Sequence, residues 1–353
     1  MADKQQKPVT GGNKPKPTGN GGQSAKDKSR AASRPVAAKG AAGGKGGNTP
    51  RPGKSGAAAP RPSGSRTGVL VAWGSVALVV VIIAVLFIVN ATKSTTQNLS
   101  YTPVTPAPAQ VVSDVANIPL STWNKVGVTS QFPVAKPNIL SGQPAMTLDG
   151  KSPAMLYYGA EYCPYCAAER WAMATALARF GTWSNLKITA SSHTDVDTAT
   201  NTFSFYGATL DSPYLTFKAV EQYTNVPVSG TPGAYTNLQN PTKEEGAIIS
   251  KYSSSKFLPN ASSSGGVSFP FVNINNLALI SGASYDPQIL AGQTWTDISS
   301  GLSDPTNPIT QAILTTGNYM SAAICNSTKG QPGDVCTSSG VQAAAKALGI
   351  SAS

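Results

Sequence analysis

The longest uninterrupted apolar stretch of the chain spans residues 68–89 and carries no charged side chain. Its 22 residues are enough to cross a bilayer as a helix, which needs about 20. Residues 1–67, by contrast, consist mostly of Gly, Ala, Pro, Ser, Lys and Arg and offer almost nothing to bury. We therefore predict a disordered basic tail followed by an uncleaved transmembrane signal-anchor helix at 68–89, with a buried core helix as the alternative.

The charge of the chain is concentrated in that tail. Residues 1–66 hold 14 Lys and Arg against two Asp, whereas the remaining residues hold 13 basic and 14 acidic side chains. Positive flanks stay on the cytoplasmic side, so we expect a single-pass membrane protein with a cytoplasmic N-terminus and an extracytoplasmic C-terminal domain in the cell envelope. The tail either holds this topology or binds anionic lipid headgroups or nucleic acid. The near-neutral domain itself predicts no nucleic-acid partner.

Beyond the apolar stretch, polar and small residues give way to short apolar runs. Residues 90–111 are rich in Thr, Pro and Ala and predict a linker, and a folded domain is expected over 112–353. Residues 154–158 are continuously apolar or aromatic, which predicts a buried strand. A helix-forming run at 167–180 follows and stops at Gly181.

Two cysteines lie between the end of this strand and the start of this helix. Cys163 and Cys166 enclose Pro164 and Tyr165, and Pro164 falls at the first helical position, where a missing N–H costs nothing. A thiol at a helix N-terminus loses its proton more easily, and only the thiolate attacks a disulfide. The pattern favours a redox-active pair. A structural disulfide and half of a zinc site are the alternatives.

The other cysteines and the single histidine limit the chemistry. Cys325 and Cys336 have ten residues between them, unlike half of a zinc ribbon, so we expect no metal and no organic cofactor. They flank a polar loop and predict a structural disulfide, with a second redox pair as the alternative. His193 is expected in a solvated loop. A hydrolase built on Cys163 and His193 would leave Cys166 unexplained.

The rest of the domain predicts a mixed α/β arrangement. A strand at 186–190 should return parallel to the strand at 154–158, because strand–helix–strand units cross over in that way. Residues 202–206 and 214–220 predict an antiparallel pair. The Gly-, Pro- and Ser-rich stretch 227–266 looks like part of an insertion, with a helix start near 241–245.

A proline-led hairpin and helices complete the domain. Pro270 heads an apolar strand, Asn275 and Asn276 predict a tight turn, and residues 277–280 return as the partner strand. A proline at the first strand residue is permitted, and its peptide bond can be cis. Helices are expected from residue 308 to about 324, in two pieces, and at 341–348.

This order of elements resembles the thioredoxin fold with a large insertion between the cysteine helix and the hairpin. The Pro164-Tyr165 dipeptide is similar to that of glutaredoxins, and the long insertion resembles periplasmic disulfide oxidases. More specifically, residues 159–171, together with Cys325 and Cys336, resemble an uncharacterised family of membrane-anchored thioredoxin-like proteins. The resemblance covers residues 112–350.

The resemblance implies roles for particular residues. Cys163 would be the catalytic nucleophile and Cys166 the resolving cysteine. Phe269 and Pro270 would face them and bind substrate together with Pro164 and Tyr165.

A membrane-tethered thiol–disulfide oxidoreductase acting on protein cysteines is therefore the expected function, with a membrane thiol oxidase or reductase as its redox partner. A non-catalytic cell-envelope binding module with structural disulfides is the alternative. A redox module should expose Cys163 and bury Cys166. Glu161, close to Cys163, opposes thiolate formation and leaves the direction of electron transfer open.

Overall fold

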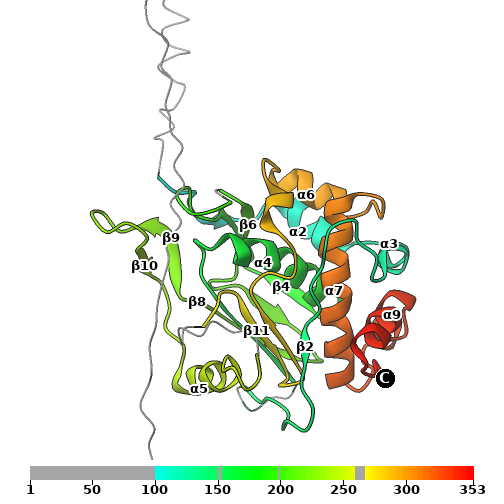
Figure 1. Ribbon diagram of the computed structural model, residues 1–353. Helices are drawn as coiled ribbons and strands as arrows, with labels where there is room; N and C mark the ends of the chain where they lie inside the picture. Colours follow the sequence, from blue (N-terminus) through cyan, green and yellow to red (C-terminus); the bar gives the residue numbers. More distant parts are fainter. Residues whose placement is uncertain (1–99, 149, 151–152, 198, 259–266) are drawn as a thin grey trace, which may run out of the picture. The chain divides into compact units, whose positions relative to one another are not determined.

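The computed structural model describes residues 100–148, 150, 153–197, 199–258 and 267–353, which form a mixed α/β domain (Figure 1). The expected tail at 1–67 and the expected anchor helix at 68–89 lie outside the described residues. Among the helices that are described, none combines the length and the apolar character needed to cross a bilayer.

The central sheet is mixed and has the strand order β2-β12-β11-β3-β8. Strand β3 pairs in parallel with β8 on one side and antiparallel with β11 on the other. The hairpin β11–β12 then continues to β2 at the edge. These strands are β2 (Asn138–Ile139), β3 (Ala154–Gly159), β8 (Thr216–Glu221), β11 (Phe271–Ile274) and β12 (Ala278–Ser281).

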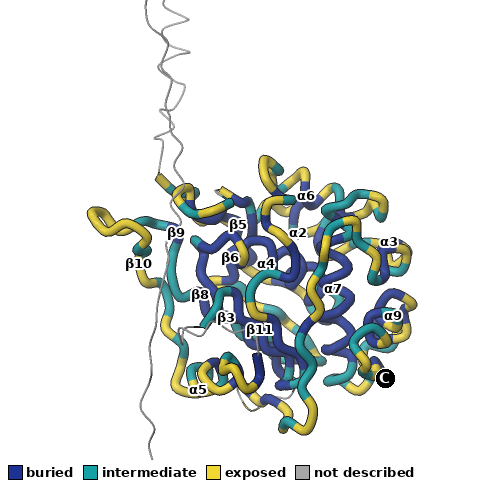
Figure 2. Tube along the Cα trace, viewed as in Figure 1, coloured by how far each residue is buried: buried dark blue, intermediate teal, exposed yellow. Residues whose placement is uncertain are grey.

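Alternation along β3 builds two separate layers of core. Met155 and Tyr157 pack into the larger cluster with helices α4 (Pro164–Leu177) and α7 (Pro308–Ser327). Leu156 and Tyr158 face the opposite side and pack with side chains of α5 (Lys243–Tyr252). All six residues of β3 are buried because both faces of this strand are covered (Figure 2).

Smaller sheets surround this core. One has the order β1-β5-β6, and two further pairs are β4–β7 and β9–β10. Their strands are β1 (Thr105–Pro106), β4 (Thr182–Ser184), β5 (Lys187–Ala190), β6 (Asn201–Ser204), β7 (Thr209–Asp211), β9 (Tyr223–Pro227) and β10 (Tyr235–Asn237).

Eight α-helices occur among the described residues. Besides α4, α5 and α7 they are α2 (Ala109–Ala116), α3 (Leu120–Val126), α6 (Trp295–Gly301), α8 (Gly333–Cys336) and α9 (Ser339–Leu348), and a 3-10 turn, η1, spans Pro287–Leu290. Strand β1 and the start of α2 fall inside the stretch 90–111 that the sequence assigns to a linker. The folded part thus reaches further toward the N-terminus than its Thr/Pro/Ala composition indicates.

Two pairings expected from the sequence are wrong. Strand β5 does not return parallel to β3; it pairs antiparallel with β6. The stretches 202–206 and 214–220 do not pair with each other, because β8 is the parallel partner of β3. The reason lies in α4, in which every residue except Tyr165 is buried. Strand β6 packs against this helix and pairs with β5, so the chain returns to the central sheet only at β8.

Several local expectations are confirmed. Thr242 caps α5 in a reciprocal capping box with Glu245. The hairpin β11–β12 turns through Asn275 and Asn276, both at positive φ, as the turn requires. One local expectation is wrong: the helix after residue 308 is not in two pieces but is a single helix of 20 residues, α7, which begins after the N-cap Asn307.

Candidate functional site

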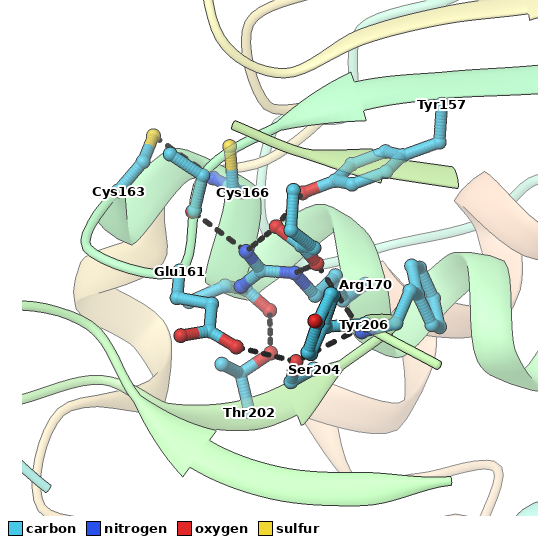
Figure 3. Close-up of polar contacts among 12 residues, drawn as sticks. Tyr157, Glu161, Cys163, Cys166, Arg170, Thr202, Ser204 and Tyr206 are labelled. Carbon is cyan, nitrogen blue, oxygen red and sulfur yellow. Dashed lines mark hydrogen bonds and ion pairs between the residues drawn. The ribbon is translucent and has the colours of Figure 1, made fainter. Parts of the chain in front are cut away.

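Cys163 occupies the N-cap position of α4. Strand β3 ends at Gly159, residues 160–163 form the connection, and the helix begins at Pro164. The Cys166 backbone N–H donates a hydrogen bond to the Cys163 sulfur at 3.3 Å (Figure 3). The thiol therefore takes the place of a capping side-chain oxygen and lies at the positive end of the helix dipole.

Both cysteines of the motif are free thiols, and both are buried. Cys166 is fully enclosed, and only 5% of Cys163 is exposed. A redox module is expected to expose Cys163 and bury Cys166; the first half of this expectation is wrong and the second is confirmed. The reason is an aromatic shell, since Tyr162, Tyr223 and Phe269 pack against the cluster that contains the two cysteines.

The surroundings of Cys163 favour its thiolate. A hydrogen bond from the Cys166 thiol lowers the pKa of Cys163 most, and the Cys166 backbone N–H and the Arg170 charge lower it further. Burial acts in the opposite direction but does not cancel these contributions. The pKa of Cys163 is therefore below its ordinary value, as a nucleophilic or leaving-group thiol requires.

Cys166 has the opposite character. Burial raises the pKa of Cys166 well above the ordinary value, and its hydrogen bond to Cys163 raises it further. The two sulfurs thus differ in role within one dithiol: Cys166 holds the proton and Cys163 carries the developing charge.

A buried ion pair lies behind the two sulfurs. Arg170 Nε donates to Glu221 Oε1 at 2.9 Å, and Arg170 Nη2 donates to Glu221 Oε2 at 2.8 Å. The same Nη2 donates to the Ala160 carbonyl at 2.6 Å, which fixes the connection just before Cys163. Both charged side chains have no exposed surface. Within the described residues, Arg170 Nη1 is buried without a hydrogen-bond partner.

Tyr157 connects this ion pair to Cys166. Its hydroxyl donates to Glu221 Oε2 at 3.4 Å. A Cβ atom placed on Gly159 would lie 2.2 Å from that hydroxyl and 2.9 Å from the Cys166 sulfur. Both groups therefore occupy the space that the missing side chain of Gly159 leaves. The buried thiol has a hydroxyl, a carboxylate and a guanidinium arranged behind it.

Glu161 is a second buried carboxyl group near Arg170, and Ser204 holds it in place (Figure 3). The Ser204 hydroxyl donates to Glu161 Oε1 at 2.6 Å, and the Glu161 side chain is buried. Burial and the nearby Glu221 charge raise the pKa of Glu161 to about 7. A carboxyl that holds its proton up to neutral pH opposes the Cys163 thiolate less than a fully charged one would.

The expected substrate-binding residues differ in their placement. Pro164 is buried at the first position of α4, whereas 43% of Tyr165 is exposed. The Phe269–Pro270 peptide bond is cis, and Phe269 packs against the cysteine cluster. The structure thus brings Phe269 to the motif, and Pro270 follows it directly as a buried residue.

The second pair of cysteines forms a disulfide. Cys325 and Cys336 are joined with a Cα–Cα distance of 5.5 Å and connect the end of α7 to α8. Both residues are buried. The alternative of a binding module with two structural disulfides requires both cysteine pairs to be bonded. In the structure only Cys325 and Cys336 are bonded, and Cys163 and Cys166 are free thiols. In the described part of the chain, no group of three or more His, Cys, Asp or Glu side chains is placed to hold a metal ion.

Some residues around the motif were expected and others were not. His193 is exposed, and its Nε2 lies 2.9 Å from Thr102 Oγ1, which fits the expected loop position. Sequence reasoning gives no role to Arg170, Glu221 or Tyr157. Arg170 could have been noticed as a charged residue one helical turn after Cys166 in an alanine-rich helix, because residues four apart share a face.

Comparisons with known proteins give a family but no activity. A family model described as "Domain of unknown function (DUF929)" matches residues 141–326, which is more than half of the chain. This stretch includes the motif cysteines, Arg170, Glu221 and Pro270. No curated protein and no solved structure matches the chain.

Proposed function

Because the chain belongs to this DUF929 family, whose description names no activity, we propose a function from its own residues: a thiol–disulfide oxidoreductase acting on protein cysteines. The observation that carries the proposal is the asymmetric dithiol. Cys163 caps a helix and has a lowered pKa, whereas Cys166, three residues later, is buried and has a raised pKa. A structural pair of thiols has no need of this difference.

A thioredoxin-like fold is part of the proposal. Its support is the arrangement around β3, which has a parallel neighbour, β8, on one side and the antiparallel hairpin β11–β12 on the other. The motif helix α4 follows β3 directly, and a cis proline, Pro270, precedes β11. These are the relationships that the sequence resemblance implies, apart from the added strands β4 to β7 and the hairpin β9–β10.

The reaction is an exchange of disulfide bonds. In the oxidised protein, a substrate thiolate attacks the Cys163 sulfur, the Cys163–Cys166 bond breaks, and Cys166 leaves as a thiolate that takes up a proton. A second substrate thiolate then attacks the substrate sulfur of the mixed disulfide and releases Cys163 as a thiolate. Two electrons pass from the substrate dithiol to the cysteine pair. In the reverse direction, Cys163 attacks a substrate disulfide and Cys166 resolves the mixed disulfide.

We propose that the forward, oxidising direction dominates. Interactions that stabilise the Cys163 thiolate lower the free energy of the reduced protein and so make its disulfide a stronger oxidant. A membrane thiol oxidase would then reoxidise the dithiol. The proposed location is extracytoplasmic, with residues 68–89 as the membrane anchor.

Trapping of substrates tests the function. In a Cys166→Ser variant, Cys163 should accumulate in mixed disulfides with cellular proteins, which non-reducing gels separate and mass spectrometry identifies. Cys163→Ser should trap none. A folded Cys166→Ser protein that also traps none would contradict the proposal. The reduction potential tests the direction: a value of about −120 mV supports oxidation of substrates, and a value of about −270 mV contradicts it.

A further inference from the structure

A pocket opens beside the cysteine motif. Its volume is about 530 Å³. One wall is Tyr162, which directly precedes Cys163, and most of the rest comes from the β9–β10 hairpin. Tyr162 and Tyr235 form its aromatic part, Pro227 and Val228 belong to its apolar part, and Asp195 provides its charge.

The aromatic part of this pocket is held in place by hydrogen bonds. The rings of Tyr162 and Tyr235 stack with centroids 4.1 Å apart and an interplanar angle of 6°. The Tyr235 hydroxyl donates to Ser192 Oγ at 2.7 Å, and the Ser192 backbone N–H donates to the Tyr162 carbonyl at 2.8 Å. The two rings therefore form a pre-arranged surface.

The charge of the pocket has one sign. Among the described residues that line it, Asp195 is the only charged one, and it is half-buried. Its Oδ1 accepts a hydrogen bond from the Val196 backbone N–H at 2.8 Å, and no ion pair to Asp195 occurs in the described part of the chain. Burial and the charges of Asp286 and Asp195 raise the pKa of Asp197, so further acidic groups lie close by.

We infer that this pocket receives a lysine or arginine side chain of the protein substrate, a few residues from the cysteine that reacts with Cys163. This inference rests on the proposed function. The outer face of the stacked tyrosines attracts a cation, and the Asp195 carboxylate, which has no ion pair among the described residues, provides the opposite charge. The aliphatic stem of either side chain suits the Pro and Val lining.

The position of the pocket sets the spacing. Tyr162 contacts the cysteine cluster and also lines the pocket, so only one side chain separates the two sites. An extended peptide advances by about 3.3–3.6 Å per residue. A basic residue two or three positions from the substrate cysteine therefore reaches the pocket while that cysteine reacts.

Single-turnover kinetics test the inference. Peptides carry one cysteine as its mixed disulfide with thionitrobenzoate, and Lys, Ala or Glu stands two or three residues to either side. The full chain with Cys166→Ser reacts through Cys163: a bond forms between Cys163 and the peptide sulfur, and thionitrobenzoate leaves and is followed by its absorbance. At one position we expect the Lys peptide to react about 3–10-fold faster than the Ala peptide and the Glu peptide to react more slowly.

Variants of the pocket provide the controls. Asp195→Asn and Tyr235→Leu should each remove the preference for Lys, and added salt should weaken it. Asp211→Asn, on β7, removes an acid outside the pocket and should leave the preference unchanged. Equal rates for Lys, Ala and Glu peptides at every position would overturn the inference alone. If the protein reacts with no peptide faster than free cysteine does, the proposed function fails instead.

Discussion

The Tyr157 hydroxyl and the Cys166 sulfur lie side by side against Gly159. A methyl group on Gly159 would approach them to 2.2 and 2.9 Å, which neither can accommodate without moving. The strand that leads to the motif thus ends in a glycine because a tyrosine and a thiol fill the space beside it.

Gly159→Ala should therefore destabilise the protein by about 1–3 kcal/mol through overpacking, measured by urea unfolding. Tyr157→Phe removes the closest atom, so the double variant should be more stable than the sum of the two single effects indicates. Gly333→Ala is the control, because a methyl there meets nothing within 4 Å. Equal effects at the two glycines would contradict this account of the packing.

Arg170→Met should cost about 3–5 kcal/mol of stability, because it leaves the Glu221 carboxylate buried and unpaired. Adding Glu221→Leu should restore most of that loss. The Arg170 charge lowers the pKa of Cys163, so the double variant should show a higher Cys163 pKa. The pH dependence of iodoacetamide labelling measures it.

A second, half-buried arginine provides the comparison for this experiment. Arg179 donates to Asn318 and Ser321 and stacks on Trp123, away from the motif. Arg179→Met should lower stability without changing the pKa of Cys163. An unchanged pKa in the variants of Arg170 would show that its charge does not act on the thiol.

Stability should fall as the pH rises through the weakly acidic range. Burial raises the pKa of Glu169 from 4.5 to about 7, although hydrogen bonds from Ser284 act in the opposite direction. The folded protein thus keeps a proton that the unfolded chain loses. The stabilisation from this retained proton is fully present below the pKa of Glu169 in the unfolded chain and is lost as the pH rises through its pKa in the folded protein. The free energy of unfolding should fall by about 3 kcal/mol over this range.

Glu169→Gln should remove its share of this slope, measured as the difference in unfolding free energy from the wild type between about pH 4.5 and 8. Glu161, whose pKa is also raised to about 7, continues to contribute the rest. Glu244→Gln, on an exposed position of α5, should run parallel to the wild type. If the Glu169→Gln profile also runs parallel, then Glu169 is already ionised in the folded protein.

Local features are predictable from the sequence, and long-range pairing is not. The capping box at Thr242 and the turn at Asn275 depend on residues within one turn of each other, so a short stretch determines them. The parallel partner of β3 cannot be found in this way, because several stretches after α4 have similar strand character. The choice of β8 depends on β6 packing against α4 while it pairs with β5.

The candidate site divides in the same way. Cys163, Pro164 and Cys166 are close in sequence, and their helix-start geometry follows from the pattern of residues. Arg170 and Glu221 are 51 positions apart, and nothing in either neighbourhood indicates that they meet. The disulfide between Cys325 and Cys336 is predictable because two cysteines flank a short polar loop.

Side chains attach the β9–β10 hairpin to the domain through Asn225 and Tyr235, and main-chain bonds hold its own strands together. The Tyr223 carbonyl accepts from the Glu161 N–H, the Gln222 carbonyl accepts from the Leu238 N–H, and a bond between Val228 and Ala234 closes the tip. Main-chain bonds of this kind tolerate many side chains. Substitutions at this tip should therefore change the lining of the pocket without moving Cys163 or Cys166, so that the pocket and the dithiol can be altered independently in one chain.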